Sequence, residues 1–323
     1  MIPERYATYE KTVTLAACNM GVVNGDKQAN LAKIEANLRE AASQGIDIVA
    51  FPEEALVGAA ECAGCRPGHP PCEAHQALAE TVPGPSTERI AALCRELDLY
   101  CAVGLAERDA NDPQTLYNAS AFIGPEGIQG TYRKLHLGSL PWVTEGITFT
   151  PGDSIPVFET RFGPVGVIIC YDFWFNPELT RIMALKGARV ILNCCATFSG
   201  PGKRDYMVGT TRVRAQENHC YVVSANHAEQ GSAGQGSYGA ESLDEGRANH
   251  FLGHSTIAGP DFPAFSRAFV ESEAGEGLVS ATLSFEKLHR WESVFPWREW
   301  RATHQQPTSR LIAEEFAKLA SGS

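Results

Sequence analysis

Patterns typical of buried strands alternate with helix-spaced apolar residues, and this alternation constrains the fold more than any other feature of the chain. Residues 13–18 form an apolar run, Leu31, Ile34 and Leu38 recur at helical spacing, and residues 46–51 form a second apolar run. A helix between two buried strands predicts strands that share a sheet covered by helices. The sequence therefore favours a layered α/β protein.

Two hairpin-like segments indicate that antiparallel strands are mixed into the sheet. Residues 115–123 and 128–132 are apolar and flank a Gly-Pro-Glu-Gly sequence, which has the composition of a tight turn. Residues 157–158 and 165–170 flank Gly163 in a similar way. We therefore expect antiparallel strands beside the parallel ones.

The second half of the chain continues the alternation without a linker or a repeat of fixed period. Asn176 and Pro177 predict the N-cap and first turn of a helix that runs to Lys186, and residues 189–194 predict another buried strand. The further elements expected are a helix over 203–218, a strand over 219–225, a Gly- and Ser-rich loop over 230–246, and strands near Ser255 and Leu278.

Composition and charge exclude several classes of function. The chain has 323 residues, of which 44% are hydrophobic and 20% charged, which is ordinary for a globular protein with a large core. Lys and Arg number 27 against 38 Asp and Glu, and no basic stripe stands out, so nucleic acid is not an expected partner. No segment approaches the roughly 18 continuous apolar residues of a membrane span. Ten cysteines behind a polar N-terminus predict a reducing, cytoplasmic location.

Three residues with useful chemistry each follow a predicted strand. Glu53 comes after the strand that ends at Phe51, Lys134 comes after residues 130–133, and Cys170 ends the apolar run of residues 165–169. Ligands of α/β sheets bind at the carboxyl ends of strands, so these positions suit a shared site. Taken singly, each residue also fits an ordinary role as a loop acid, a surface lysine or a buried cysteine.

The sequences around these three residues, in this order, resemble the nitrilase (carbon-nitrogen hydrolase) superfamily. The matching strings are Phe-Pro-Glu at 51–53, Tyr-Arg-Lys-Leu-His-Leu at 132–137, and Gly-Val-Ile-Ile-Cys-Tyr-Asp at 166–172. The resemblance covers roughly residues 11–290. The chain departs from it at residues 173–177, a stretch that is one residue longer than the usual spacing to the Pro-Glu pair of the family.

The resemblance implies a catalytic triad for hydrolysis of a carbon–nitrogen bond. Cys170 is then the nucleophile, Glu53 the general base and Lys134 a cation that lowers the pKa of the thiol. The Lys134 ammonium and the backbone N–H of Tyr171 face the oxyanion, and Glu145 matches a second glutamate that holds the lysine and positions the substrate. The expected cycle passes through a thioester, requires no cofactor or metal, and releases ammonia.

The substrate expected from the residues after the cysteine is a small amide. Nitrile-cleaving members usually carry Trp-Glu there, whereas this chain has Tyr171 and Asp172, as in amidase-like branches. Enzymes for N-carbamoyl amines or amino acids often place an arginine shortly after the cysteine, where this chain is aromatic. Both remain alternatives. The expected substrate-binding residues are Trp142, Phe173, Trp174, Asn193 and Phe198.

Two readings of a different kind stay open. Cys62, Cys65, Cys72 and His75 have a spacing that suits a structural zinc site, although the family hydrolyses its substrates without metal. A scaffold or zinc-binding module that keeps the fold without activity is the alternative to an enzyme, but all three triad residues are present. Substitution of Cys170 separates the two, because only hydrolysis needs that thiol.

The fold that the resemblance implies is a four-layer αββα sandwich, with two mixed sheets between layers of helices. We expect an N-terminal extension over residues 1–10, a carbon-nitrogen hydrolase domain over 11–290, and a C-terminal tail over 291–323. The tail is rich in aromatic residues, so it is expected to pack on the body or on a neighbouring subunit. Members of the family usually form homodimers through their helix layers.

Overall fold

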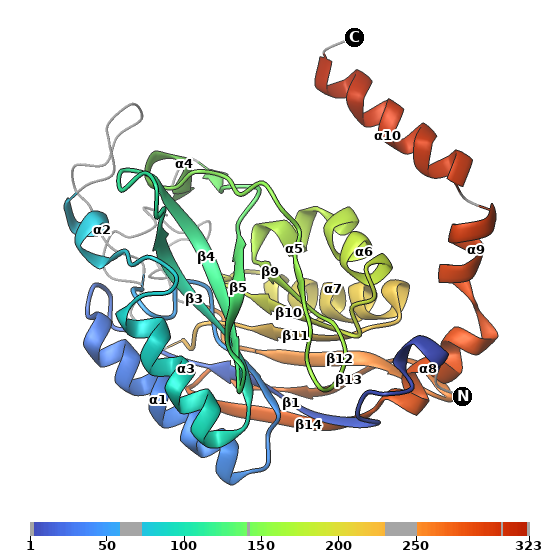
Figure 1. Ribbon diagram of the computed structural model, residues 1–323, viewed down its shortest axis with the longest axis horizontal. Helices are drawn as coiled ribbons and strands as arrows, with labels where there is room; N and C mark the ends of the chain where they lie inside the picture. The colour runs from blue at the N-terminus through green and yellow to red at the C-terminus, as the bar shows by residue number, and fades with distance from the viewer. Residues whose placement is uncertain (1–2, 59–72, 141–142, 230–250, 305, 322–323) are drawn as a thin grey trace.

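A computed structural model describes residues 3–58, 73–140, 143–229, 251–304 and 306–321. Twelve of the strands form two six-stranded sheets (Figure 1). The first sheet has the order β14 (Gly277–Ser284), β1 (Thr12–Asn19), β2 (Ile48–Ala50), β3 (Tyr100–Arg108), β4 (Leu116–Gly124) and β5 (Gly127–Arg133). The second has the order β13 (Ala264–Glu271), β12 (Thr256–Asp261), β11 (Tyr221–Ala225), β10 (Val190–Cys194), β9 (Val165–Ile169) and β8 (Val157–Phe158).

Both sheets are mixed, as the hairpin sequences predict. Strands β1, β2 and β3 run parallel, as do β9, β10 and β11, while the outer strands of each sheet pair antiparallel. A separate two-stranded ribbon joins β6 (Ser139–Leu140) and β7 (Val143–Thr144). The parallel strands carry long apolar runs because both of their faces are covered.

The helices lie on the outer faces of the two sheets and complete the four-layer αββα sandwich that the resemblance implies (Figure 1). Helices α1 (Lys27–Ser43) and α3 (Pro85–Leu97) cover the first sheet, and α6 (Pro177–Leu185) and α7 (Lys203–Asn218) cover the second. The remaining helical segments are η1 (Glu4–Tyr6), α2 (Glu73–Leu78), α4 (Glu145–Thr148), α5 (Tyr171–Phe175), α8 (Phe285–Val294), α9 (Trp297–His304) and α10 (Gln306–Ser321).

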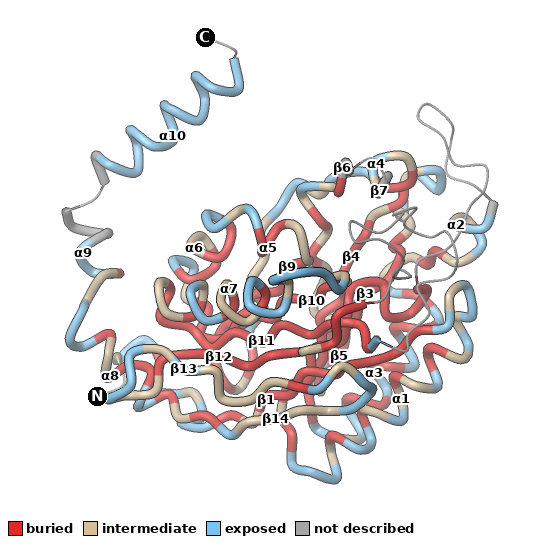
Figure 2. Tube along the Cα trace, turned by 180° about the vertical axis from the view of Figure 1, so that it is seen from behind, coloured by how far each residue is buried: buried red, intermediate tan, exposed pale blue. Residues whose placement is uncertain are grey.

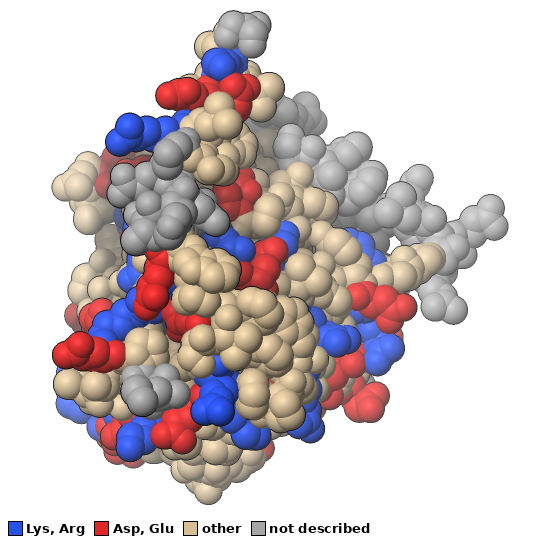
Figure 3. Space-filling view, turned by 90° about the vertical axis from the view of Figure 1, so that its right-hand side faces the viewer, with Lys and Arg blue, Asp and Glu red and all other residues tan. Residues whose placement is uncertain are grey.

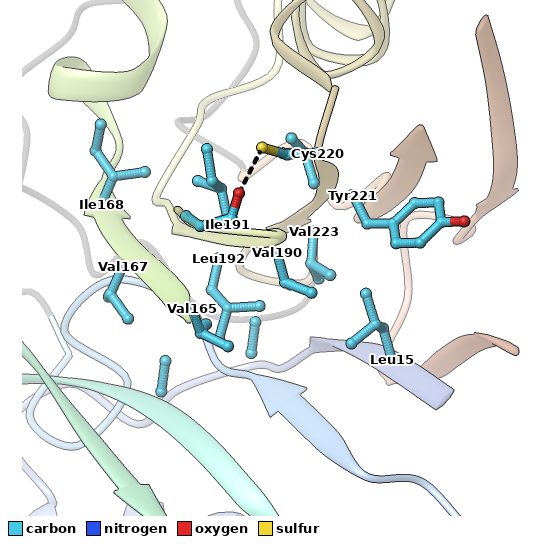
Figure 4. Close-up of a cluster of buried hydrophobic side chains, with 14 of the residues drawn as sticks. Leu15, Val165, Val167, Ile168, Val190, Ile191, Leu192, Cys220, Tyr221 and Val223 are labelled. Atoms are coloured by element: carbon cyan, nitrogen blue, oxygen red, sulfur yellow. Dashed lines mark hydrogen bonds between the residues drawn. The ribbon is translucent and has the colours of Figure 1, made fainter. Parts of the chain in front are cut away.

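The main core lies between the facing sheets. Alternate residues of β9 and β10, such as Val167 and Leu192, point toward the first sheet, whereas Ile168 and Ile191 point toward the helices (Figure 4). Leu15 reaches into the same cluster from the first sheet. Burial on both faces fixes the register of these strands, and the register determines where each strand ends relative to its neighbours.

Two local differences from the sequence-based expectation surround the segment after β9. Asn176 does not cap α6 with its side chain; instead its Nδ2 donates a hydrogen bond to the carbonyl oxygen of Tyr171, at 3.4 Å. Residues 171–175, for which no helix was predicted, form the short helix α5. Strand β13 was also not predicted, because most of its residues are partly exposed and polar residues interrupt its apolar ones.

The C-terminal residues divide into a part that contacts the body and a part that does not. The Trp291 indole donates to the carbonyl oxygen of Ala264 at 2.9 Å, and the buried Arg298 donates to the carbonyl oxygens of Ala184 and Asn218. Helix α10 projects away from the sandwich (Figure 1), and its described side chains are exposed (Figure 2). Within the described part of the chain, no helix is both long and apolar enough to span a membrane.

Candidate active site

Glu53 lies in a tight turn that follows β2, at the carboxyl end of the parallel strands of the first sheet. The turn packs so closely on β3 that a Cβ on Gly104 would lie 2.4 Å from the backbone nitrogen of Glu54. Glycine at position 104 is therefore required for this approach, and its carbonyl accepts a 2.9 Å hydrogen bond from the Leu56 N–H. Glu54 itself has a φ of 49°, a left-handed conformation that turns the chain out of the strand.

Lys134 directly follows β5 and is held there by β4. Its backbone N–H donates to the carbonyl oxygen of Asn118 at 2.8 Å, and its own carbonyl accepts from Gly152 at 2.8 Å. The side chain is only 2% exposed. Lys134 is therefore enclosed by the protein and is not the ordinary surface lysine that its position taken singly would also fit.

The Lys134 ammonium bridges two buried carboxylates. Its Nζ lies 2.6 Å from Oε1 of Glu53 and 2.6 Å from Oε1 of Glu145. Asn118 Nδ2 donates to the same two oxygens, at 2.9 Å and 3.4 Å. The other oxygen of Glu145 accepts from the Gly138 N–H at 2.5 Å. Charge-assisted bonds of this kind fix side chains strongly, so the three charged groups form one rigid cluster.

The surroundings of Lys134 favour its ammonium form. Burial alone lowers the pKa of Lys134, but the negative charges of Glu53 and Glu145 outweigh burial and raise that pKa well above its usual value. Burial and the nearby Glu53 raise the pKa of Glu145, while Lys134 opposes them. The two glutamates therefore stabilise the charged form of Lys134.

Cys170 lies at the turn between β9 and α5 in a strained backbone conformation, with a φ of 42° and a ψ of −102°. Its N–H is directed at two oxygens of the neighbouring strand, Oδ1 of Asn193 at 3.1 Å and the carbonyl of Cys194 at 3.1 Å. Asn193 is itself fixed by a 3.1 Å bond from its Nδ2 to the Ser224 hydroxyl. Strain that surrounding bonds maintain is typical of functional sites, where it orients a reacting side chain.

The surroundings of Cys170 raise the pKa of its thiol above the usual range. Burial is the main cause and the negative charge of Glu53 the next, whereas Lys134 and a hydrogen bond from the Ala196 N–H act in the opposite direction. We expected the lysine to lower this pKa, and its effect has that sign but is outweighed. The neutral thiol is therefore favoured over the thiolate.

Asp172 joins the cysteine segment to the lysine segment. This fully buried carboxylate accepts hydrogen bonds from the Tyr132 hydroxyl at 2.6 Å, from the Leu135 N–H at 2.8 Å and from the His136 N–H at 2.9 Å. The donors flank Lys134 on both sides, so one residue of α5 fixes the chain on either side of the lysine.

Comparisons with known proteins identify the family of the chain. The model of the carbon-nitrogen hydrolase family matches residues 14–293. The chain belongs to the carbon-nitrogen hydrolase family. A protein named nitrilase from Pyrococcus abyssi is 33% identical over 84% of this chain and 89% of its own length. The human omega-amidase NIT2 is 30% identical over 92% of this chain and 95% of its own length.

The solved structures support the same fold. The carbon-nitrogen hydrolase from Helicobacter pylori superposes with a TM-score of 0.76 at 20% identity and covers 93% of this chain and 98% of its own. The family match and the omega-amidase relative together identify this chain as an amidase-type hydrolase that acts on C–N bonds.

The structure places the predicted substrate-binding residues of this hydrolase in different settings. Trp174 is largely buried and borders a cavity of about 360 Å³ beside α7, and Phe198 stacks on Phe251 with ring centres 5.4 Å apart. Asn193 holds the backbone of Cys170. Phe173 is fully buried in the core, so we assign it to packing. Trp142 lies outside the described residues.

Sequence reasoning missed three groups that the structure brings to the site. These are Asn118, which bonds to both carboxylates, Asp172, whose motif was noted without a role, and the Ala196 N–H at the thiol. Asn118 had no signal, because an asparagine inside a predicted strand resembles any buried polar residue. Of the predicted zinc ligands, Cys62, Cys65 and Cys72 lie outside the described residues, and His75 contacts the Phe149 ring edge-on.

Proposed function

We propose that this enzyme hydrolyses a small primary amide to a carboxylate and ammonia through a thioester on Cys170. One observation carries the proposal: the Cys170 thiol shares a buried site with a lysine that bridges two glutamates. A nucleophile, a proton acceptor and a fixed positive charge are the groups that attack on an amide requires.

In the acylation step, Glu53 removes the thiol proton as the sulfur attacks the amide carbonyl. The thiol needs a base because its pKa is raised, and the effect of Glu53 on that pKa supports a short path between the two groups. The tetrahedral intermediate carries a negative oxygen, which the Lys134 ammonium and the Tyr171 N–H stabilise. Each such donor typically lowers the activation barrier by about 3 kcal/mol. Glu53 then protonates the leaving nitrogen, ammonia departs, and the C–N bond is replaced by a C–S bond.

In the deacylation step, Glu53 removes a proton from water, which attacks the thioester. The C–S bond breaks, the carboxylic acid leaves, and the proton returns to the Cys170 sulfur. Glu145 helps to keep Lys134 in place through its own 2.6 Å bond to Nζ, which is separate from the bond that Glu53 makes.

The human omega-amidase relative supports an amide as the substrate. The name of the Pyrococcus relative favours one second candidate, hydrolysis of a nitrile by the same thiol. The two reactions differ after the attack of the thiol, since a nitrile first gives a thioimidate that water must convert to the thioester. N-carbamoyl amines remain a third class to include in any assay.

Ammonia release from a panel of primary amides, N-carbamoyl amines and nitriles tests the proposal. We expect release from the amides, and loss of that release in Cys170→Ala. Release from nitriles alone would replace the amidase by a nitrilase. Release that survives in Cys170→Ala would overturn the mechanism for every substrate class.

The exposed apolar residues of α7 and its neighbours support a homodimer. Val213, Phe265 and Phe295 are 54%, 51% and 43% exposed and line a groove of about 580 Å³. Figure 3 shows a broad area of uncharged side chains on the side of the molecule turned to the viewer. Apolar surface of this kind is typical of a subunit contact.

The seven described cysteines, all free thiols, support a reducing compartment such as the cytoplasm.

A further inference from the structure

His227 lies just after β11, outside every motif that the sequence analysis used. It is 2% exposed and pairs with Met20 at the end of β1 through an isolated parallel bridge. Its carbonyl accepts from the Gly253 N–H at 3.0 Å, and the next N–H, that of Ala228, donates to Met20 at 3.1 Å. The backbone of His227 is therefore fixed between the two sheets.

The imidazole of His227 contacts the backbone of the general base. Its Nε2 lies 2.6 Å from the carbonyl oxygen of Glu53. A carbonyl oxygen only accepts, so Nε2 must carry the proton and donate it. Burial lowers the pKa of His227 to about 4, so the ring is neutral at physiological pH and holds this single tautomer.

This hydrogen bond falls where the backbone is strained. Glu54, the residue directly after this carbonyl, has a φ of 49°. A buried carbonyl without a donor is costly, and the His227 ring supplies that donor. The bond therefore sets the orientation of the Glu53 peptide, and with it the position from which the Glu53 side chain reaches Lys134.

The opposite side of the imidazole is also fixed. The ring stacks on Phe251 with centres 4.4 Å apart and planes inclined by 23°. Phe251 in turn stacks on Phe198, two residues after Ala196, whose N–H reaches the Cys170 thiol. His227 thus stands between the segment that bears the base and the segment that faces the nucleophile.

We propose that His227 is a positioning residue, whose Nε2–H bond to the Glu53 carbonyl holds the general base in line with Cys170. The proposal rests on the proposed amide hydrolysis for its rate effect. Its effect on the thiol does not depend on the substrate. A shift of about 1 Å in a reacting group lowers a rate by about a hundredfold, so the expected loss in kcat is about ten- to a hundredfold.

Two substitutions separate the hydrogen bond from the ring. His227→Phe keeps the stack on Phe251 and removes the donor, whereas His227→Gln removes the ring and keeps an N–H of similar reach. His289→Phe is the matched control, because His289 is 1% exposed, stacks on Tyr6 at 4.9 Å and loses a bond to Glu292 away from the site. Melting temperatures establish that each variant folds, and His227→Asn, whose amide is too short to reach, replaces the Phe variant if that one does not fold.

Two readouts are needed. The first is kcat and KM for the amide that the wild type cleaves. The second is the pH midpoint of Cys170 alkylation by iodoacetamide, followed by mass spectrometry, which requires no substrate. Besides Glu53, the groups that act on this thiol are Lys134, Glu145 and the Ala196 N–H. Displacement of Glu53 weakens one of the causes that raise the thiol pKa, so the midpoint moves to lower pH.

We expect His227→Phe to lose kcat with little change in KM and to lower the alkylation midpoint, while His227→Gln and His289→Phe stay close to wild type. Equal kcat and equal midpoints in His227→Phe and His289→Phe would overturn the role of His227. If the wild type cleaves no amide, the proposed function fails on its own, and the midpoints still decide between the two outcomes for His227.

Discussion

The Tyr132 hydroxyl donates a 2.6 Å hydrogen bond to the buried Asp172 carboxylate and so joins the strand before Lys134 to the helix after Cys170. Cys170 and Lys134 follow strands of different sheets, so the distance between them depends on how the two sheets pack. Asp172 adds a direct polar link between the two segments, because its other oxygen accepts from the His136 N–H and lies 2.7 Å from His136 Nδ1. The hydrogen bonds of Asp172 therefore act together with the hydrophobic core to hold the Cys170 and Lys134 segments in place.

Asp172→Ala should damage both stability and turnover. The buried Tyr132 hydroxyl loses its acceptor, which costs about 1–3 kcal/mol, and the partly buried N–H groups of Leu135 and His136 lose theirs as well. Urea denaturation measures the loss of stability, and kcat measures the displacement of Lys134. Asp172→Asn, which keeps one acceptor oxygen, should fall between Ala and wild type. A variant with wild-type kcat would show that Asp172 does not position the lysine.

Glu53→Gln should abolish turnover and yet make the Cys170 thiol easier to ionise. Burial is the first cause of the raised thiol pKa and the Glu53 charge the second, so removal of that charge lowers the pKa. The thiolate then forms at lower pH, and the pH profile of Cys170 alkylation shifts downward. Glu292→Gln is the control, since this buried carboxylate pairs with Arg298 instead. An unchanged profile in Glu53→Gln would remove Glu53 from the neighbourhood of the thiol.

Lys134→Met should make stability depend on pH. Without the ammonium, Glu53 and Glu145 become buried carboxylates with no counter-ion, and their folded-state pKa values rise above the unfolded values. The folded state then binds more protons, so the free energy of unfolding falls as pH rises. We expect a loss of about 3–5 kcal/mol at pH 8 and a smaller loss at pH 5, from urea denaturation at both values. Equal losses at the two pH values would contradict the charge cluster.

Val213→Glu should dissociate the proposed homodimer. Val213 is 54% exposed on α7 beside the groove, and a carboxylate there must either lose its hydration or prevent the contact. Sedimentation velocity gives the oligomeric state, and Val23→Glu, at a valine that is 42% exposed, is the control. A monomeric wild type, or a Val213→Glu variant that stays dimeric, would place the interface elsewhere.

The sequence predicted most of the fold because buried strands and amphipathic helices leave strong periodic signals. The helix over 203–218 has the same bounds in the structure, and the strands that precede Glu53 and Cys170 end within one residue of the expected positions. Helix α5 escaped prediction because its five residues are too few to show a period. Strand β13 escaped because it is partly exposed on both faces and so lacks the regular alternation of a half-buried strand.

The charged residues at the strand ends were predictable from the sequence, but their supports were not. Motifs identify Glu53, Lys134, Glu145 and Cys170, while the bonds of Asn118 to the two glutamates depend on the pairing of β4 with β5. The raised thiol pKa also depends on burial, which a strand pattern does not measure. Contacts between distant segments therefore required the structure.

The most direct test of the central claim is to quench the wild type with acid during turnover of an amide. The protein is then digested, and mass spectrometry gives the mass of the peptide that contains Cys170. The account predicts that this peptide gains the mass of the acyl group, and that hydroxylamine removes it. Cys170→Ala should show no acyl peptide and a kcat lower by about a thousandfold or more, while Cys220→Ala, at another buried thiol, keeps wild-type turnover. An acyl group on a different residue, or a kcat of Cys170→Ala close to that of the wild type, would contradict the thioester mechanism.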